Sequence, residues 1–321
     1  MPSESQLLKQ NAFGVGVASV NSDNQIIEAR FLKAELSQID EKQIAGSIDS
    51  LITQDLIRKI STKKISIQIS LDAAPKDVAD VYLRLHLLSM RKVKPNQINL
   101  DGVFGILPNL IWSSIGPCQL ENFEIVRAEL LAKYPAIAFY GVDKFPRMID
   151  YVIPDGVRIA DGNRVRLGAY LSSGTTVMHE GFVNFNAGTL GKSMVEGRIS
   201  AGVVVGDGTD IGGGASIMGT LSGGGKEKIS VGERTLLGAN SGLGISLGND
   251  CVVEAGLYLT AGSKVMLPKE PNQSAGKIVK AVELSGANNL LFRRNSQTGA
   301  IEALPKSGSW QGLNSVLHQN Q

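Results

Sequence analysis

The sequence predicts a parallel β-helix, and a six-residue period together with a low content of aromatic rings indicates it. Aliphatic residues recur every six positions from Ile153 to Val183. Glycines keep the same period at Gly156, Gly162, Gly168 and Gly174. A helix repeats its apolar face about every 3.6 residues and a strand every second residue. A sustained period of six residues is instead typical of hexapeptide coils. The chain is only 5% aromatic and has 37 glycines, which suits a narrow aliphatic interior.

The period continues through most of the second half of the chain. The aliphatic positions that follow it are Ile153, Ile159, Val165, Leu171, Val177, Val183, Ile199, Val205, Ile211, Ile217, Val231, Leu237, Leu243, Leu247, Val253, Leu259 and Val265. Three hexads would close one triangular coil, with one inward aliphatic on each side. The register fails between Val183 and Ile199, at Gly219–Ile229, and between Leu243 and Leu247. We expect loops at these breaks, and loops often carry functional residues.

The rest of the chain predicts further parts around the β-helix. With 321 residues, of which 43% are hydrophobic, there is room for two or three domains. Alternation predicts strands at Phe13–Val20 and Lys63–Ser70, and apolar periodicity predicts helices at Asp77–Lys92 and Glu121–Lys133. The predicted organisation is an N-terminal α/β domain (1–105), a linker with a helix (106–150), the β-helix (151–266) and a short C-terminal segment with late strands (267–321).

Charge and composition exclude several classes of protein. The 32 Lys and Arg are matched by 30 Asp and Glu, so no basic surface for nucleic acid is predicted. No basic segment precedes an apolar run at the N-terminus, and no run of 18 apolar residues occurs, so neither secretion nor membrane spanning is expected. The two cysteines, Cys118 and Cys251, are far apart in sequence, which predicts structural thiols in a cytoplasmic protein.

Several motifs do not fit the chemistry that they first suggest. Gly242–Gly248 is one residue too long for a dinucleotide fingerprint and lies inside the hexads. Gly223–Lys226 resembles a phosphate loop, but Glu227 stands where Ser or Thr is needed. A zinc site of the type found in β-helical carbonic anhydrases needs three histidines, and the three in this chain are scattered at His86, His179 and His318.

Two polar groups remain as candidates. The break after Val183 holds Glu196 and Arg198, which could activate a nucleophile or could form an ordinary exposed ion pair. Lys280, Arg293 and Arg294 form a basic cluster that could bind phosphates or could simply be solvated.

Five longer segments resemble the tetrahydrodipicolinate N-succinyltransferase family, in its longer-chain branch. They are Val177–Ile199 (VMHEGFVNFNAGTLGKSMVEGRI), Gly212–Gly225 (GGGASIMGTLSGGG), Leu237–Leu247 (LGANSGLGISL), Glu254–Gly262 (EAGLYLTAG) and Leu291–Ser296 (LFRRNS). The resemblance is dense over about residues 150–296 and is more specific than the hexads, which serve many acyltransferases and some non-enzymes.

The resemblance implies a left-handed β-helix that assembles as a homotrimer with active sites between adjacent subunits. Members of the family transfer a succinyl group from succinyl-CoA to 2-amino-6-oxopimelate, which forms by ring hydration of tetrahydrodipicolinate, in lysine and diaminopimelate biosynthesis. The implied partners are therefore succinyl-CoA and tetrahydrodipicolinate, and no cofactor beyond the co-substrate is required.

The same motifs imply roles for individual residues. Glu196 matches the catalytic glutamate, described in the family either as a general base or as a nucleophile that forms an acyl-anhydride, and the residues leave this open. Arg198 would hold a substrate carboxylate. The residues implied in succinyl-CoA binding are Gly213, Ser216, Ala239, Glu254, Ala255 and Gly262 along the acyl-CoA channel, Lys280, Arg293 and Arg294 at the nucleotide phosphates, and Asn295 and Ser296 in the same motif.

One departure from the family concerns Mg²⁺. Related members can hold this ion with an acidic pair near the three-fold axis, and the matching positions here are Asn163 and Glu180. The loss of one carboxylate weakens a site for a hard cation.

Two other functions remain open at this point. One is a hexapeptide acyltransferase that uses acetyl-CoA or another amine, and the other is a trimeric β-helix without catalytic activity.

Overall fold

The computed structural model describes residues 7–269 and 276–306. Contacts divide the chain into two compact units. Of the described residues, the N-terminal unit comprises 7–153 together with Arg166–Gly168, and the β-helix unit comprises Pro154–Val165 and the residues from Ala169 onwards.

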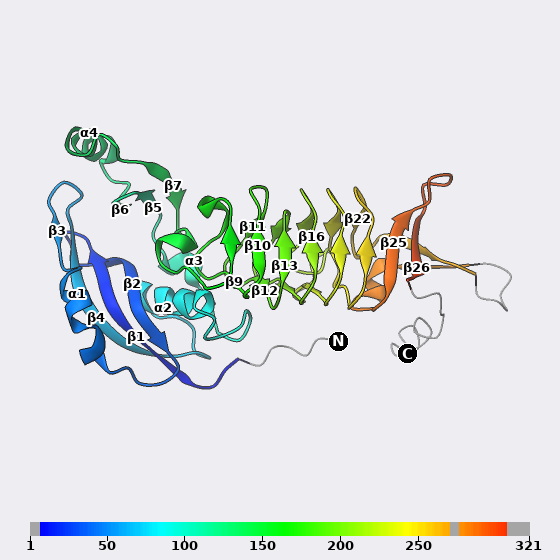
Figure 1. Cartoon of the computed structure of the whole chain (residues 1–321), viewed down its shortest axis with the longest axis horizontal. Helices are drawn as coiled ribbons and strands as arrows, with labels where there is room; N and C mark the ends of the chain where they lie inside the picture. Colours follow the sequence, from blue (N-terminus) through cyan, green and yellow to red (C-terminus); the bar gives the residue numbers. More distant parts are fainter. Residues whose placement is uncertain (1–6, 270–275, 307–321) are drawn as a thin grey trace. The chain divides into compact units, whose positions relative to one another are not determined.

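The N-terminal unit is built on an antiparallel sheet of four strands in the order β2-β1-β4-β3 (Figure 1). The strands are β1 (Asn11–Val20), β2 (Ile26–Glu35), β3 (Gln54–Asp55) and β4 (Ile60–Ser70). The strands predicted at Phe13–Val20 and Lys63–Ser70 lie within β1 and β4, whereas β2 was not predicted. The apolar residues of β2 do not alternate strictly, because both neighbours of Glu28 are buried as well.

Helix α2 (Val78–Ser89) packs against the sheet and begins where Asp77 accepts a hydrogen bond from the amide of Asp80 at 2.9 Å. It is shorter than the predicted Asp77–Lys92. Its Arg84 is fully buried, and the guanidinium bonds to the Asp80 carboxylate at 2.7 Å and to three backbone carbonyls. This buried cation is therefore fully paired, which is the condition for tolerating a charge in a core.

His86 of α2 is also fully buried, beside β2. Its Nδ1 lies 2.7 Å from the Tyr82 carbonyl oxygen, and its Nε2 accepts the amide of Phe31 at 3.2 Å. This pair of contacts requires the neutral ring with its proton on Nδ1. Burial lowers the pKa of His86 from 6.5 to about 4.

A second, three-stranded sheet follows in the order β6-β5-β7. The remaining elements of the N-terminal unit are η1 (Glu41–Ile44), α1 (Ala45–Asp49), α3 (Val103–Ile106), β5 (Leu110–Ser113), β6 (Gly116–Cys118), α4 (Phe123–Lys133), β7 (Phe139–Asp143) and η2 (Met148–Asp150). The helix predicted at Glu121–Lys133 corresponds to α4.

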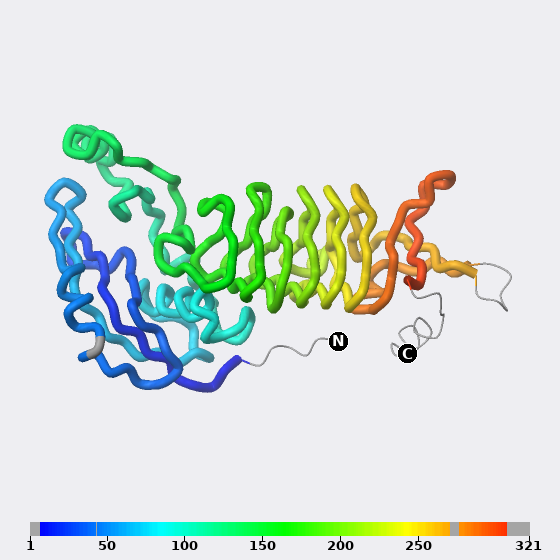
Figure 2. The backbone as a smooth tube through the Cα atoms, in the orientation of Figure 1, coloured from blue at the N-terminus to red at the C-terminus, as the bar shows by residue number. Residues whose placement is uncertain are grey.

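The second unit is a parallel β-helix whose coils stack along one axis (Figures 1 and 2). Its three sides are three sheets. The ten-stranded sheet contains β8 (Arg158–Ile159), β10 (Thr175–Val177), β13 (Ser193–Val195), β16 (Asp210–Ile211), β19 (Leu236–Leu237) and β21 (Val252–Val253), and then β23 to β26 of the C-terminal segment. The five-stranded sheet contains β11 (Phe182–Val183), β14 (Arg198–Ile199), β17 (Ser216–Ile217), β20 (Gly242–Leu243) and β22 (Tyr258–Leu259). The four-stranded sheet contains β9 (Tyr170–Leu171), β12 (Gly188–Thr189), β15 (Val204–Val205) and β18 (Ser230–Val231), and η3 (Gly162–Arg164) lies in the first coil.

The predicted aliphatic positions form the core of these coils, with one exception. From Val165 to Val265 all of them are buried, and Ile159 is half-buried. Ile153 was wrongly assigned to the core, since it is 74% exposed. It precedes β8, the first strand of the ten-stranded sheet, so no strand lies beside it on which it could stack.

Two of the predicted breaks are not loops. Thr189 and Val195 occupy the inward positions between Val183 and Ile199, paired with their equivalents on neighbouring coils. The six-residue period breaks here because only Glu196 and Gly197 separate β13 from β14, so one side of the coil is short. The break between Leu243 and Leu247 is likewise a short side, since both residues are buried.

The break at Gly219–Ile229 does form the expected loop, closed at its base by an isolated bridge between Thr220 and Lys228. The C-terminal strands are β23 (Lys264–Leu267), β24 (Lys277–Lys280), β25 (Leu290–Arg294) and β26 (Ile301–Pro305), and η4 (Ala281–Leu284) follows β24. The remainder of the predicted C-terminal segment, 270–275 and 307–321, lies outside the described residues.

Both cysteines are buried with free thiols, and burial raises the pKa of each. A thiol with a raised pKa is a weak nucleophile, so a structural role fits both. Among residues 7–269 and 276–306, no helix combines the length and apolar character that a membrane crossing needs.

His86 predicts a pH dependence of stability. Between pH 6.5 and about 4 the unfolded chain binds a proton at this histidine and the folded chain does not, so the free energy of unfolding falls as the pH falls. The loss should approach about 3 kcal/mol below pH 4. We expect His86→Gln to flatten this part of a urea-denaturation pH series, while the control His179→Gln, at an exposed position, keeps the slope. A slope that persists in His86→Gln would contradict the assignment.

The core positions predict a contrast between two isoleucines. Ile217→Ala should destabilise the β-helix by roughly 2–5 kcal/mol, because it leaves a cavity in a fully buried column. The matched change Ile153→Ala should stay within about 0.5 kcal/mol, since that side chain is exposed. Thermal unfolding followed by circular dichroism measures both, and equal shifts would contradict the proposed register.

Candidate functional site

One corner of the β-helix, between the ten-stranded and five-stranded sheets, carries a column of the predicted site residues. We call it the Glu196 corner. From coil to coil it holds Glu196, Gly213, Ala239, and the pair Glu254 and Ala255. Backbone hydrogen bonds link successive members: the amide of Gly214 to the Glu196 carbonyl (3.4 Å), that of Asn240 to Gly213 (2.8 Å), and that of Gly256 to Ala239 (2.8 Å).

Glu196 is half-buried at the first level of this column. Its amide donates to the Ile211 carbonyl at 2.8 Å, which fixes its backbone, and a Cβ added at Gly213 would lie 3.6 Å from its Oε2. The absence of a side chain at Gly213 therefore leaves space beside the carboxylate. Within the described part of the chain, the Glu196 carboxylate has no hydrogen bond or ion pair.

Arg198 does not pair with Glu196, although the two are close in sequence. Its guanidinium donates to Ser216 Oγ on the adjacent strand, from Nη2 at 2.6 Å and from Nε at 3.1 Å. Register explains this contact, because Arg198 of β14 lies directly opposite Ser216 of β17 on the outer surface. The exposed ion pair that the sequence left open is thus absent from the described residues, and the carboxylate and the cation are separately available.

The outward row of the five-stranded sheet continues from Ser216 to Gly242 and then Tyr258. A side chain on Gly242 would collide with the ring of Tyr258, so the glycine lets this ring lie against the strand. Tyr258 was not among the predicted site residues. It directly precedes the inward Leu259, and fixing the register would have placed it on this face.

The column also contains backbone amides without acceptors. Within the described residues, the N–H groups of Gly213, Ala239 and Ala255 have no hydrogen-bond partner, whereas the residues on either side of each donate to the next or previous coil. These donors recur at equivalent places on three successive coils, where a chain-like ligand with carbonyl groups could accept from them.

The loop Gly219–Ile229 lies beside the C-terminal ends of β20 and β22. Ser222 fixes this loop, since its Oγ accepts the amide of Ala261 at 2.6 Å and its own amide donates to the Gly244 carbonyl at 3.0 Å. Gly262 follows Ala261, so this predicted binding residue lies beside the loop and away from the Glu196 corner. The contacts of Ser222 could not be predicted from the sequence, because its partners are far away in the chain.

The C-terminal strands bring further predicted residues together above β21. Glu254 Oε2 accepts the amide of Arg294 at 2.6 Å. Glu302, which was not predicted, accepts from Arg293 Nε at 3.0 Å and from Asn295 Nδ2 at 2.8 Å. The hydrogen bond from Asn295 and the charge of Arg293 hold the pKa of the Glu302 carboxyl below its usual value.

The last two residues that the motifs imply in succinyl-CoA binding, Ser296 and Lys280, are exposed. Ser296 follows β25, and Lys280 lies on β24 opposite Lys264, which places a second cation next to it. Lys264 was not predicted, because pairing between β23 and β24 is not visible in the sequence alone.

The two predicted magnesium ligands make a poor site within one chain. Asn163 and Glu180 supply a single carboxylate, and Arg164 donates to the backbone carbonyls of His179 and Glu180 at 3.2 and 3.0 Å. A guanidinium at this turn competes with a hard cation for the same oxygen-rich surroundings. No group of three or more His, Cys, Asp or Glu suited to a metal occurs in the described residues. These residues therefore do not fit Mg²⁺ in a single subunit.

Comparison with known families agrees with the sequence motifs. Residues 43–105 match "Tetrahydrodipicolinate N-succinyltransferase N-terminal", residues 107–147 match "Tetrahydrodipicolinate N-succinyltransferase middle", and residues 228–261 match "Hexapeptide repeat of succinyl-transferase". The N-terminal half, which carried few readable family motifs, is thus covered as well.

Individual relatives extend the match to nearly the whole chain. The 2,3,4,5-tetrahydropyridine-2,6-dicarboxylate N-succinyltransferase of Vibrio cholerae is 57% identical over 96% of this chain and 98% of its own length. The enzyme of the same name from Pseudomonas aeruginosa is 58% identical over 77% of this chain and 71% of its own length.

Solved structures give the same result for the fold. A crystal structure from Campylobacter jejuni, named for a 2,3,4,5-tetrahydropyridine-2-carboxylate N-succinyltransferase, is 32% identical with a TM-score of 0.79, and the match covers 96% of this chain and 94% of that one. The predicted fold class is confirmed: a left-handed parallel β-helix with an N-terminal α/β part and a C-terminal β segment. On these matches, the chain belongs to the tetrahydrodipicolinate N-succinyltransferase family.

Proposed function

We propose that this protein transfers the succinyl group of succinyl-CoA to the amine of 2-amino-6-oxopimelate, the ring-opened hydrate of tetrahydrodipicolinate. The observation that carries the proposal is the 57% identity to the Vibrio cholerae enzyme over nearly the full length of both chains. The reaction serves lysine and diaminopimelate biosynthesis.

Glu196 acts in this proposal as the general base. An amine that attacks a thioester carbonyl must lose a proton, and an unpaired carboxylate within reach can accept it. Glu196 meets the condition because neither Arg198 nor any other described cation is bonded to it. The alternative role, a nucleophile that forms an acyl-anhydride, would require the same carboxylate to attack the thioester itself.

The unpaired amides of the Glu196 corner form the acyl-CoA channel. The N–H groups of Gly213, Ala239 and Ala255 can donate to carbonyl oxygens of the pantetheine arm or to the oxyanion of the tetrahedral intermediate. Their spacing by one coil suits an extended chain that runs parallel to the helix axis. Ala and Gly at these places leave room for it, since neither carries a bulky side chain.

Charged residues then bind the two ends of the substrates. Arg198, held by Ser216, offers its remaining N–H groups to a carboxylate of the acceptor. Arg294 lies next to Glu254 at the far end of the column, and Arg293, Asn295, Ser296 and Lys280 continue the polar surface towards the nucleotide phosphates of CoA. Gly262 and the Ser222 loop border the opposite side.

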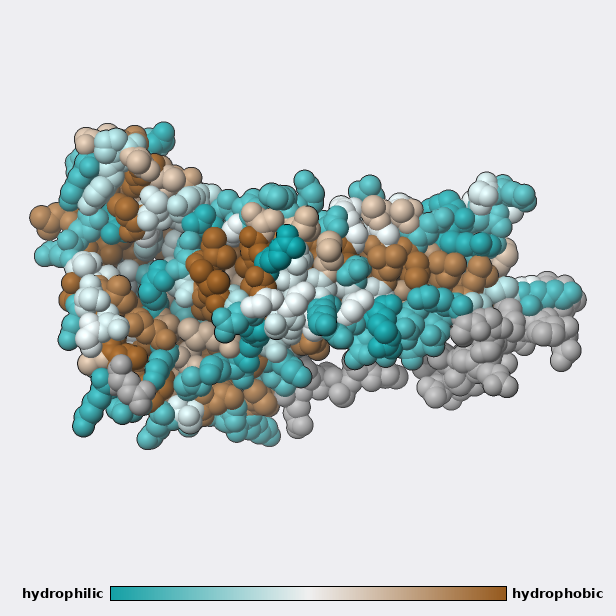
Figure 3. Space-filling model, in the orientation of Figure 1, coloured by the Kyte–Doolittle hydropathy of each residue, from teal (hydrophilic) through white to brown (hydrophobic). Residues whose placement is uncertain are grey.

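The protein assembles in this proposal as a homotrimer with its sites between subunits. Large apolar side chains on the outer surface of the ten-stranded sheet support the assembly, and Figure 3 shows apolar residues at the surface of the coils. They are Met194, Leu236, Met266 and Ile278. Met266 and Ile278 are direct cross-strand neighbours, so their apolar surface is continuous and would be buried by another subunit.

Replacement of Glu196 tests the reaction. Glu196→Gln keeps the shape of the side chain but removes the proton acceptor, so we expect kcat to fall by at least about 100-fold. Release of CoA thiol from succinyl-CoA in the presence of tetrahydrodipicolinate measures the rate, and acetyl-CoA in the same assay should react far more slowly.

The matched control is Glu233→Gln, an exposed carboxylate of the β-helix outside the Glu196 corner, which should keep its activity. Light scattering should give the same trimer mass for both variants. Full turnover in Glu196→Gln would contradict the role of this residue as the general base. The absence of any thiol release from the unaltered protein would contradict the proposed function itself.

If Arg198 binds the acceptor, its replacement should change the KM for tetrahydrodipicolinate and leave the KM for succinyl-CoA almost unchanged. Arg198→Met should raise the KM for tetrahydrodipicolinate by about 10- to 100-fold, the value of a hydrogen bond to a charged group, and leave the KM for succinyl-CoA within about twofold. Ser216→Ala removes only the partner that positions the guanidinium, so its effect should be about three- to tenfold. Equal changes in both KM values would argue against this role.

A further inference from the structure

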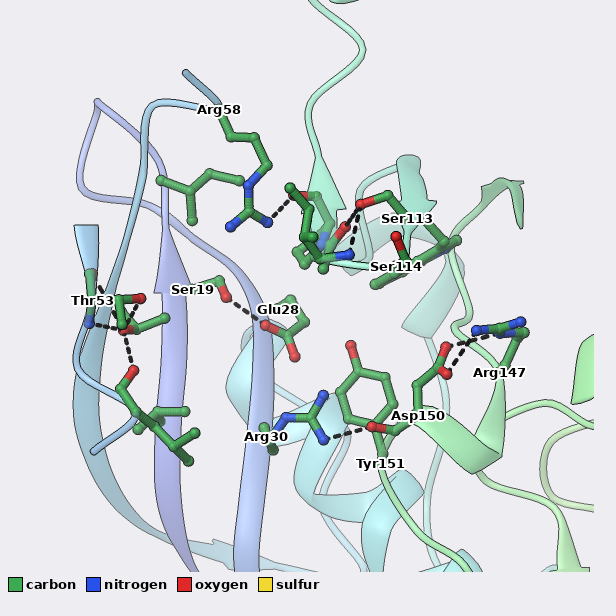
Figure 4. A pocket seen from close by; sticks show the side chains of 18 of the residues that line it. Ser19, Glu28, Arg30, Thr53, Arg58, Ser113, Ser114, Arg147, Asp150 and Tyr151 are labelled. Carbon is green, nitrogen blue, oxygen red and sulfur yellow. Dashed lines mark hydrogen bonds and ion pairs between the residues drawn. The ribbon is translucent and has the colours of Figure 1, made fainter. Parts of the chain in front are cut away.

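The N-terminal unit contains a cavity of about 380 Å³ that the proposed reaction does not use. Its floor is the sheet of β1, β2 and β4, and its cover comes from β5, β6 and the chain around η2. Figure 4 shows the charged and hydroxyl-bearing side chains that surround it. Because charged and hydroxyl-bearing side chains lie among the apolar ones on both sides of the cavity, a ligand with polar groups suits it.

Glu28 is the buried acid of this cavity. It is 5% exposed, and its Oε2 accepts Ser19 Oγ at 2.5 Å from the directly opposite position on β1. Within the described residues no cation lies within ion-pair distance of it. A buried carboxylate that accepts from neutral hydroxyl groups, with no cation bonded to it, still has acceptor capacity for a cationic group.

Arg30 supplies the positive charge of this cavity. It lies two residues further along β2, so both side chains project from the same face of the sheet, with backbone positions about 6.6 Å apart. Its Nη1 donates to the Asp150 carbonyl at 2.5 Å, and its guanidinium lies 4.5 Å from the centre of the Tyr151 ring. No carboxylate in the described residues pairs with it.

The other two arginines of the cavity are already neutralised. Arg58 bonds to Asp55 at 2.7 Å, and Arg147 bonds to Asp150 through two hydrogen bonds of 2.8 and 2.9 Å. Glu28 and Arg30 are therefore the two charges of the lining that have no opposite charge bonded to them. The two side chains do not form an ion pair with each other, and both line the cavity.

Tyr151 adds a neutral donor between these two charges. Figure 4 shows its hydroxyl turned towards the Glu28 carboxylate. Burial, and after it the charge of Glu28, raises the pKa of the Tyr151 hydroxyl well above its usual value, so the phenol keeps its proton. The fully buried Tyr82 lies next to it, with the two ring centres 6.0 Å apart.

We propose that this cavity is a binding site for a free α-amino acid, with the ligand's ammonium group at Glu28 and its carboxylate at Arg30. A phosphate or dicarboxylate would meet the charge of Glu28, and a metal ion would find only one carboxylate that is not already paired. A zwitterion satisfies both unpaired charges at once and adds no net charge to a buried site. Because the site lies within the N-terminal unit, it does not depend on the proposed succinyl transfer.

Three small probes with the same propyl group separate the two charges. L-Norvaline carries both groups, pentanoate lacks the ammonium group, and butylamine lacks the carboxylate. In calorimetric titration of the full-length protein, we expect norvaline to bind at least tenfold more tightly than either analogue. Equal binding of the three probes, or no binding of norvaline, would overturn the proposal.

Variants then assign the binding to this cavity. Glu28→Gln and Arg30→Met should each weaken norvaline binding at least tenfold, whereas the control Glu35→Gln, an exposed carboxylate at the end of the same strand, should leave it unchanged. Succinyl transfer without norvaline should be unaffected in all three variants. Unchanged norvaline affinity in both cavity variants would place the binding elsewhere and refute the site.

Hydrogen exchange on the unaltered protein gives a readout that does not depend on the folding of any variant. Norvaline should slow exchange in peptides that cover β1, β2 and residues 147–151. Slowing confined to the β-helix would mean that the amino acid binds only at the Glu196 corner, and the proposal would fail.

Discussion

The pairing of each coil with the next is the constraint on which the site depends. On each side of the β-helix, parallel backbone hydrogen bonds hold an inward residue against its equivalents on the neighbouring coils, as with Ile199 between Val183 and Ile217. Once an inward residue is fixed, the residue before it must face outward. Arg198 precedes Ile199 and Ser216 precedes Ile217, so the core itself brings the guanidinium to the hydroxyl.

The same constraint explains why the Glu196 carboxylate and the Arg198 guanidinium do not form an ion pair with each other. Only Glu196 and Gly197 separate the inward Val195 from the strand that carries Arg198, so Glu196 must lie at the corner itself. Gly197 is needed at this tight turn, because a side chain there would collide with the Ala215 carbonyl. The carboxylate is turned towards Gly213 while Arg198 lies on the adjacent sheet, bonded to Ser216.

Much of the β-helix and its site could be predicted because a coil contacts only its neighbours, which gives the sequence a visible period. The errors lie where this rule weakens. Ile153 fits the period but has no preceding coil, and Thr189 is inward although polar, because its hydroxyl bonds to Thr175 at 2.6 Å inside the core. Glu302 and Ser222 act through partners brought near by strand pairing or by the loop, and no local pattern encodes such contacts.

In the N-terminal unit the important contacts join residues far apart in the sequence and do not repeat. No sequence pattern therefore indicates its cavity. Glu28 and Arg30 lie in β2, the strand that was not predicted, and Ser19 meets Glu28 only through antiparallel pairing. A charged residue between two buried neighbours is costly unless it is paired. In α2 Asp80 supplies the opposite charge for Arg84, whereas no described residue supplies an opposite charge for Glu28 in β2. The difference between these two buried charges, one fully bonded and one left open towards a cavity, is what distinguishes a structural ion pair from a site prepared for a ligand.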